Sequence, residues 1–259
     1  MADFSDADLR GSRFERAELS GSQFWASDMT GAWFRHVDMH GVVMRGVELC
    51  DVDINGEIKN LKINDVDVGP LIEAELNRRD PDRAKMRPAD PAGFREAWDI
   101  LSRRWEQTVE RARRLPPERL HESVDGEWSF TETLRHLVFA TEAWVGRAIL
   151  GSTAPWDPLG LPWGEMPDTP GVPRDRDARP SLDEVLALRR TRTDMVRDVL
   201  AGLTDESLAA QTTPVDSGFA WPPPVSFPVR KCLLIVLNEE WEHRLFAERD
   251  LAALEAREP

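Results

Sequence analysis

The chain has 259 residues, with 47 acidic and 33 basic side chains and a formal charge of −14. This excess of negative charge argues against a general nucleic-acid binder and against a protein that adheres to anionic membranes. The first residues lack the pattern of a secretory signal, no apolar run approaches the length of a bilayer span, and only two cysteines occur, so we expect a cytoplasmic protein.

A large apolar residue recurs at every fifth position from Phe4 to Ile54. A second series, of smaller residues, lies two positions before each of them. A period of five fits neither the 3.6 of a helix nor the 2 of a strand. The sequence therefore predicts a chain that turns a corner every five residues, with both series pointing towards the centre of the coil.

Segments such as Ala2-Asp3-Phe4 resemble the A(D/N)LXX pattern of the pentapeptide-repeat family. The resemblance implies a short right-handed, four-sided (quadrilateral) β-helix over residues 1–69, and the register slip after Gly56 is interpreted as its closing cap. A family function, mimicry of DNA by an acidic rod that binds gyrase, needs a longer rod than these repeats provide. We favour an interaction module, able to form a homodimer or to bind a protein partner.

The chain after the repeats is predicted to be helical. Residues 70–90 are interpreted as a linker with a short helix near 71–79, and residues 91–259 as a four-helix bundle. Two long loops rich in proline and tryptophan, residues 151–180 and 211–228, are either ordered coverings, as walls of a pocket, or disordered segments.

Capping signals place the helix starts. Asp90 is a predicted N-cap before a proline, and opens a helix that ends before Pro116. Capping boxes that begin at Ser129 and Ser181 predict the second and third helices, which run to about Leu150 and Leu200. The fourth helix is predicted to run from about Val229 to Ala256.

Three side chains of this helical region are candidate metal ligands. Glu239 precedes His243 by four residues, so both project from one face of the fourth helix, and His136 lies in the second helix. An i,i+4 pair completed from a facing helix is how bundles build metal sites, and three ligands leave positions open for water or substrate. The alternatives are a surface Glu–His pair, a core histidine, and Glu240 as a competing ligand.

The segments GEWSFTETLRHLVFATEAW and NEEWEHRLFAERDL resemble the second and final helices of the DinB-like superfamily. That group includes the mycothiol-dependent maleylpyruvate isomerases and related thiol transferases. The resemblance covers about residues 86–259 and implies an all-α bundle with a divalent metal held by three histidines. His136 matches the first ligand and His243 the last, while Glu239 stands where the middle histidine is expected.

Further side chains are candidates to support the ligands or to contact substrate. Glu132, Glu240 and Asp250 are placed to accept a hydrogen bond from a ligating imidazole, although Glu132 also belongs to a capping box. Arg249 is a candidate anchor for a substrate carboxylate, or an ion-pair partner of Asp250. The sequence assigns no catalytic residue.

Together with the candidate ligands, the resemblance implies a divalent-metal-dependent enzyme acting on a small-molecule substrate, as a thiol S-transferase of the mycothiol type or an isomerase. The expected cofactors are zinc or nickel, then manganese or iron, with a low-molecular-weight thiol as co-substrate. The alternatives are a non-catalytic ligand-binding or protein-interaction module with a degenerate metal site and, third, a gyrase-directed DNA mimic. If Glu239 points towards His136 and His243, catalysis stays open, whereas a solvent-facing Glu239 favours binding alone.

Overall fold

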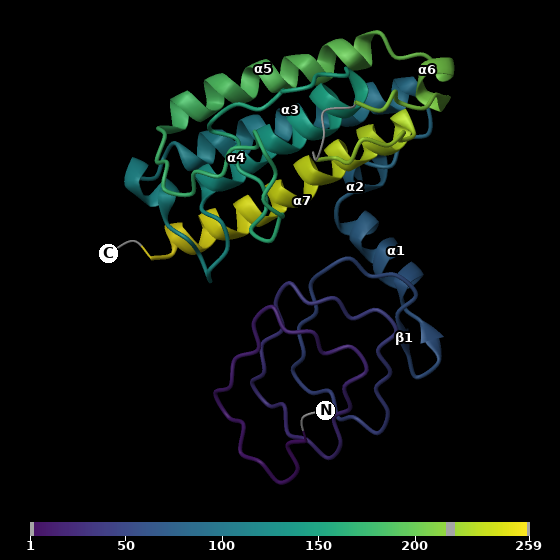
Figure 1. Ribbon diagram of the computed structural model, residues 1–259, viewed down its shortest axis with the longest axis vertical. Helices are drawn as coiled ribbons and strands as arrows, with labels where there is room; N and C mark the ends of the chain where they lie inside the picture. The colour runs from purple at the N-terminus through teal and green to yellow at the C-terminus, as the bar shows by residue number, and fades with distance from the viewer. Residues whose placement is uncertain (1–2, 216–220, 258–259) are drawn as a thin grey trace. The chain divides into compact units, whose positions relative to one another are not determined.

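The computed structural model describes residues 3–215 and 221–257, so predictions that involve Ala2, residues 216–220 of the second long loop, or the last two residues lie outside the described parts. The chain divides into two compact units, Met1–Gly56 and Glu57–Pro259 (Figure 1).

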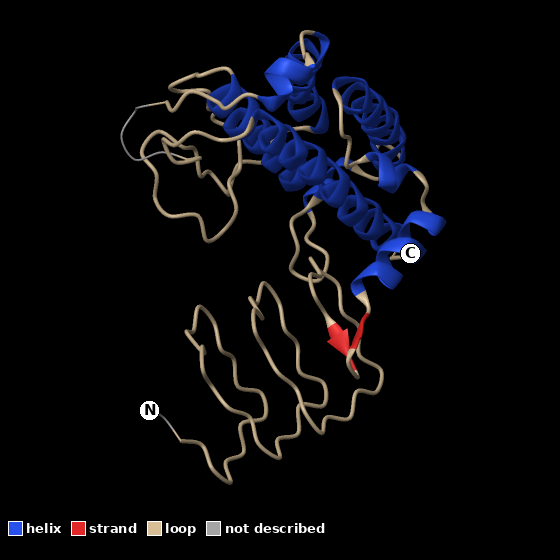
Figure 2. Ribbon diagram, turned by 90° about the vertical axis from the view of Figure 1, so that its right-hand side faces the viewer, coloured by secondary structure: helices blue, strands red, loops and turns tan. Residues whose placement is uncertain are grey.

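The first unit winds in successive loops with a corner every five residues (Figure 2). Backbone with positive φ recurs at that spacing, at Asp6, Gly11, Arg16, Gly21, Ala26, Gly31, His36, Gly41, Gly46 and Asp51. At the first glycine corner the Ser12 N–H donates to the Leu9 carbonyl over 3.0 Å, which is a four-residue turn with glycine third, as a type II turn requires. The predicted five-residue corner is confirmed.

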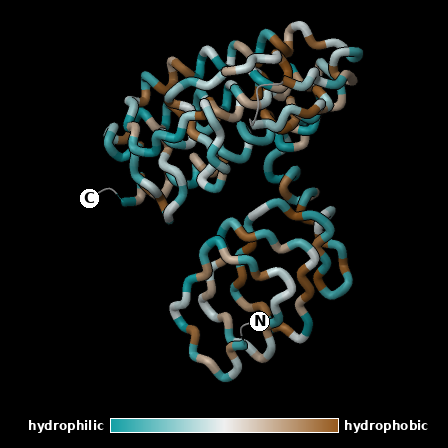
Figure 3. The backbone as a smooth tube through the Cα atoms, viewed as in Figure 1, coloured by the Kyte–Doolittle hydropathy of each residue, from teal (hydrophilic) through white to brown (hydrophobic). Residues whose placement is uncertain are grey.

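The apolar residues recur along this coil (Figure 3), but their side chains are not buried. Phe14 is 59% exposed and Phe24 is 64% exposed. Within residues 3–56 every side chain is exposed except that of Arg35, which is half-buried. The backbone hydrogen bonds of these residues close corners and do not join one loop to the next. The two apolar series therefore lack the packed centre that the sequence predicts.

A small hairpin occupies the region expected to close the repeats. Its strands, β1 (Lys62–Ile63) and β2 (Val66–Asp67), pair antiparallel and are the only strands in the described parts of the chain. The two residues between them, Asn64 and Asp65, both have positive φ, as a type I′ turn requires. Local turn chemistry thus accounts for the hairpin.

The segment interpreted as a linker is packed onto the bundle. It contains α1 (Gly69–Arg79) and α2 (Asp82–Lys85). The Arg104 guanidinium of the next helix donates to Asp80 over 2.7 Å and to Asp82 over 2.8 Å. These ion pairs fix the segment to the helix that follows it.

Four long helices form the bundle (Figure 1), namely α3 (Pro91–Ala112), α4 (Phe130–Thr141), α5 (Leu182–Ala201) and α7 (Val229–Glu255). All three predicted caps are present, because Asp90 accepts from the Gly93 N–H and both capping boxes are formed. Besides α2, two other short helices were not predicted, η1 (Pro117–His121) and α6 (Asp205–Ala209). In the described parts of the chain, no helix is long and apolar enough to cross a membrane.

The second predicted helix changes character halfway. After α4 the chain continues as a π-helix, η2 (Glu142–Ile149), instead of an α-helix to Leu150. π-helical turns carry one extra residue per turn and often occur near functional sites. Glu142, the residue at which α4 gives way to η2, is fully buried.

The first long loop is an ordered covering over α4. Phe139 of α4 stacks on Trp156 with ring centroids 5.2 Å apart, and Trp163 contacts the same ring. Met166 and Val172 of this loop are buried in the same cluster. The loop therefore packs through its aromatic and apolar side chains onto the helix that carries His136.

Candidate metal centre

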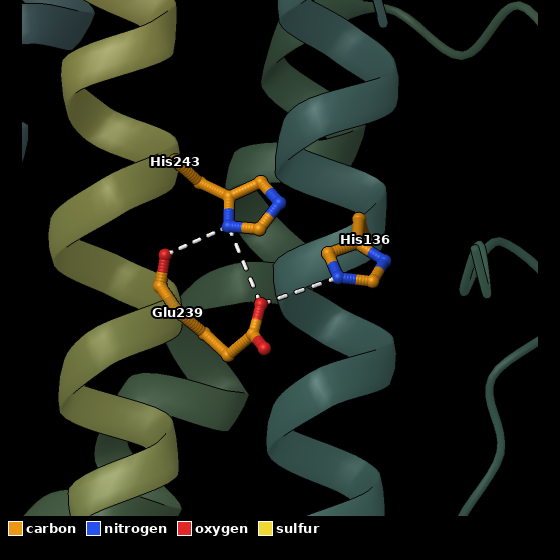
Figure 4. A group of neighbouring side chains, drawn as sticks. All are labelled: His136, Glu239 and His243. Atoms are coloured by element: carbon orange, nitrogen blue, oxygen red, sulfur yellow. Dashed lines mark hydrogen bonds and ion pairs between the residues drawn. The ribbon is translucent and has the colours of Figure 1, made fainter. Parts of the chain in front are cut away.

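The three predicted ligands converge between two helices (Figure 4). Glu239 and His243 project from α7 towards α4, and His136 projects from α4 to meet them. One ligand atom from each residue lies within 4.8 Å of the others. Glu239 Oε2 is 3.4 Å from His136 Nε2 and 3.3 Å from His243 Nδ1. Glu239 therefore faces the histidines, as the enzyme hypothesis requires.

His136 is held in one orientation by the loop that covers it. Its residue is 7% exposed, and its Nδ1 lies 2.9 Å from the Leu161 carbonyl. A carbonyl oxygen only accepts, so this nitrogen carries the proton and donates it. The other ring nitrogen, Nε2, faces the Glu239 carboxylate at 3.4 Å, so it lies on the side of the ring where a metal ion would be bound.

His243 is bound to the backbone of its own helix. Its Nδ1 lies 2.9 Å from the Glu239 carbonyl, so Nδ1–H is the donor and the Nε2 lone pair is left free. Burial lowers the pKa of His243 to about 4, and His136 adds to this shift by charge repulsion. The ring is therefore neutral at neutral pH, the form that binds metals.

Glu239 is the charged member of the group. Burial raises the pKa of its carboxyl, but the hydrogen bond and charge of His136, together with the charge of His243, outweigh burial and bring the pKa below its ordinary value. The carboxylate is thus ionised at neutral pH. Two imidazoles and one carboxylate form a donor set typical of divalent transition metals.

The spacing of the donors fits a single ion. Two ligands about 2.1 Å from a tetrahedral metal lie about 3.4 Å apart. The 3.4 Å between His136 Nε2 and Glu239 Oε2 matches this value. It is also longer than an ordinary N–H···O hydrogen bond. One ligand atom of each of the three residues lies within 4.8 Å of the other two, so the three donors are gathered around one space.

An indole forms one wall of the site. The ring of Trp128, a half-buried residue just before α4, lies 4.4 Å from the His136 ring and 5.9 Å from the His243 ring, centroid to centroid. Phe246 contacts His243 on its own helix at 5.9 Å. These rings shield the polar group from water and so strengthen its electrostatic interactions.

The structure gives Glu132 and Glu240 roles away from the three ligands. The Glu132 carboxylate accepts from the Ser129 N–H over 2.9 Å and from its hydroxyl over 2.7 Å, which completes the capping box. The Glu240 carboxylate is buried and paired with Arg189 of α5 over 2.8 Å. The prediction that either residue supports a metal ligand is therefore wrong, because each carboxylate is engaged elsewhere.

Arg249 and Asp250 form the predicted ion pair, with Arg249 Nε donating to Asp250 over 2.7 Å. Asp250 is buried, whereas about half of the Arg249 side chain is exposed. The Arg249 guanidinium lies 5.5 Å from the ring of Phe246, which in turn contacts His243. Contact of this arginine with a substrate stays a prediction.

Sequence reasoning missed Leu161 and Trp128 as parts of the site. The Leu161 contact is made by a backbone carbonyl, which no side-chain pattern reveals. Trp128 stands one residue before the Ser129 cap and eight before His136. This spacing places Trp128 just before the first turn of α4, so the sequence did contain a signal that the indole lies near His136.

The comparisons with known proteins match both parts of the chain. A family model of the DinB superfamily covers residues 100–247, which include all three candidate ligands. A model of pentapeptide repeats matches eight copies within residues 2–41 and 17–56. Searches of the curated proteins and of the solved structures found no significant match. The chain is therefore a member of the DinB superfamily that carries pentapeptide repeats at its N-terminus.

Proposed function

We propose that His136, Glu239 and His243 bind a divalent cation, and that the chain uses it in a thiol S-transfer or isomerisation reaction. The observation that supports the proposal is the convergence of two imidazoles and an ionised carboxylate from facing helices. Zinc and nickel suit two imidazole ligands, and the carboxylate in place of a third imidazole also admits manganese or iron.

A bound cation supplies Lewis acidity, which lowers the pKa of a coordinated thiol or water. The residues of the chain prepare the site for this chemistry. The Leu161 carbonyl keeps the His136 Nε2 free, the Glu239 carboxylate offsets one positive charge, and Trp128 limits the access of water. A low-molecular-weight thiol of the mycothiol type is the proposed co-substrate, and a cytoplasmic location, where thiols stay reduced, is part of the same proposal.

Elemental analysis tests the metal site directly. The protein is purified without metal-affinity resin or chelator, beside His136→Ala and His243→Ala, with the exposed His40→Ala as the matched control. We expect near-stoichiometric metal in the wild type and the control, and its loss in both site variants. A wild type that stays metal-free after incubation with divalent ions contradicts the proposal.

Cobalt substitution tests the thiol. Adding 2-mercaptoethanol to the Co²⁺-loaded protein is expected to produce the near-ultraviolet charge-transfer band of a thiolate ligand. If the protein binds cobalt but shows no such band at saturating thiol, the proposed metal site is supported and the proposed thiol co-substrate is contradicted. That outcome favours the second candidate, a non-catalytic module that binds a small ligand in the bundle.

For the first unit we propose that the coil closes into a right-handed four-sided β-helix that docks a partner protein or a second copy. The five-residue recurrence of positive φ and the repeat match support this proposal. Equilibrium sedimentation of the full chain tests self-association. A supercoiling assay with gyrase and the full chain tests the DNA-mimic alternative, for which the few repeats make a short rod.

A further inference from the structure

The loop that orients His136 is fixed to the helix that carries it. The Leu161 N–H donates to the Arg135 carbonyl over 3.2 Å, one residue before the histidine, while the Leu161 carbonyl accepts from His136. The Arg135 side chain is fully buried, and its Nε donates to the Leu159 carbonyl over 2.8 Å. The C-terminal end of the loop segment 157–161 is thus held directly at the site.

The other end of the stretch is held by a buried carboxylate. Glu142, the first residue of η2, is fully buried, and both of its oxygens lie 3.2 Å from the Asp157 N–H. Arg192 of α5 donates its Nε–H to the same carboxylate over 2.9 Å and lies 3.7 Å from the Asp157 side chain. Three segments of the chain therefore meet at Glu142.

The chain between these two anchors is tightly turned. The Gly160 N–H donates to the Asp157 carbonyl over 2.9 Å, and the Leu159 N–H donates to the Asp157 carboxylate over 2.9 Å. A Cβ added at Gly160 would lie 3.1 Å from the Asp157 carbonyl and 3.3 Å from Glu142 Oε2. This leaves little freedom between the Glu142 anchor and the Leu161 carbonyl.

We propose that Glu142 is a positioning residue for the metal site, which holds residues 157–161 so that the Leu161 carbonyl keeps the proton of His136 on Nδ1. Glu142 stands six residues from His136 and acts on it through the loop. The functional meaning of this inference rests on the proposed metal site, but the placement of the proton can be measured without metal.

Imidazole ¹H–¹⁵N correlation spectra of the metal-free protein at pH 8 provide the first readout. In the wild type we expect a His136 Nδ1 proton that exchanges slowly with water. Glu142→Gln removes the charge that binds Arg192 at nearly constant volume, and we expect the proton to exchange rapidly and the tautomers to mix. Glu165→Gln, which removes an exposed carboxylate from the same loop, is the matched control and leaves the signal unchanged.

Zinc affinity provides the second readout. Loss of a hydrogen bond that orients a ligand typically weakens metal binding about 10- to 100-fold, and we expect at least a tenfold loss in Glu142→Gln and none in the control. If Glu142→Gln fails to fold, Gly160→Ala, which crowds the same turn, is read by the same criteria.

A folded variant with the wild-type His136 signal and zinc affinity overturns the inference. So does a wild type without a protected Nδ1 proton. If the wild type binds no zinc but Glu142→Gln shows the expected faster exchange of the His136 Nδ1 proton, the proposed function alone is refuted.

Discussion

The buried ion pair between α5 and α7 gives a sharp test of how this bundle is stabilised. Glu240 is 2% exposed and Arg189 is 6% exposed, and Arg189 Nη2 lies 2.8 Å and 3.1 Å from the two carboxylate oxygens. The guanidinium also lies 5.2 Å from the ring of Trp105. Glu240→Ala leaves the buried positive charge of Arg189 inside the bundle without this carboxylate.

Removing one partner of a buried pair typically costs about 3–5 kcal/mol, because the remaining charge keeps its desolvation penalty without compensation. Since the pair is almost fully buried, solvent screening reduces this figure little. For a domain of this size the loss corresponds to a fall in Tm of roughly 6–20 °C. Replacing both residues, as Arg189→Met with Glu240→Leu, removes the charges together and is expected to cost less than either single change.

Urea unfolding followed by the far-ultraviolet helical signal measures these differences, because the long helices lie in the second unit. A double-mutant cycle of Arg189→Met, Glu240→Leu and the variant that carries both isolates the pair from the loss of packing. If Glu240→Ala costs less than about 1 kcal/mol, or if the double variant loses the sum of the single losses, the pair is not the buried unit described above.

Three further predictions concern other parts of the chain. Burial raises the pKa of Glu142 from 4.5 to about 7, so its contribution to stability is present at low pH and is lost as the pH rises from about 4.5 through about 7. Urea unfolding at several pH values should show the wild type losing stability relative to Glu142→Gln over this pH range. A stability difference that does not change with pH contradicts the prediction. Burial also raises the pKa of the Cys232 thiol to about 11, whereas Cys50 is exposed. Ellman's reagent should therefore react with one thiol in the native chain and with the second only in urea. Rapid reaction of both thiols in the native chain would show that Cys232 is accessible. Ala26 has a φ of 46°, and Ala26→Gly is expected to stabilise the first unit by about 1 kcal/mol in thermal unfolding, a gain that would be absent if this corner were relaxed in solution.

The sequence was most informative where the signal is local. Caps at Asp90, Ser129 and Ser181 act within three residues, so the starts of three helices followed from a few neighbouring side chains. The candidate ligands were also predictable, because the i,i+4 spacing of Glu239 and His243 fixes their common face once the helix is known.

The features that were missed depend on distant parts of the chain. The π-helical turn at Glu142 is a change in backbone hydrogen bonding, and its side-chain pattern is compatible with an ordinary helix. Glu240 pairs with Arg189, which is 51 positions away in the sequence. Because of this distant partner, Glu240 does not support the metal ligands, although it is next to the candidate ligand Glu239 in the sequence. Apolar periodicity also predicted a packed centre in the repeats, but periodicity gives the direction of side chains and not the distance between successive loops.

The corners of the first unit alternate in a way that lengthens the effective repeat. From Asp6 to Gly41, a non-glycine residue and a glycine take turns at the positions of positive φ. The hydrogen-bonded corners, such as that from Leu9 to Ser12, recur every ten residues. Inserting five residues would therefore exchange the two kinds of corner downstream and force side chains into a backbone form that suits glycine. Inserting ten residues would preserve the alternation, so gain or loss of sequence between Asp6 and Gly41 should be tolerated in steps of two pentapeptides.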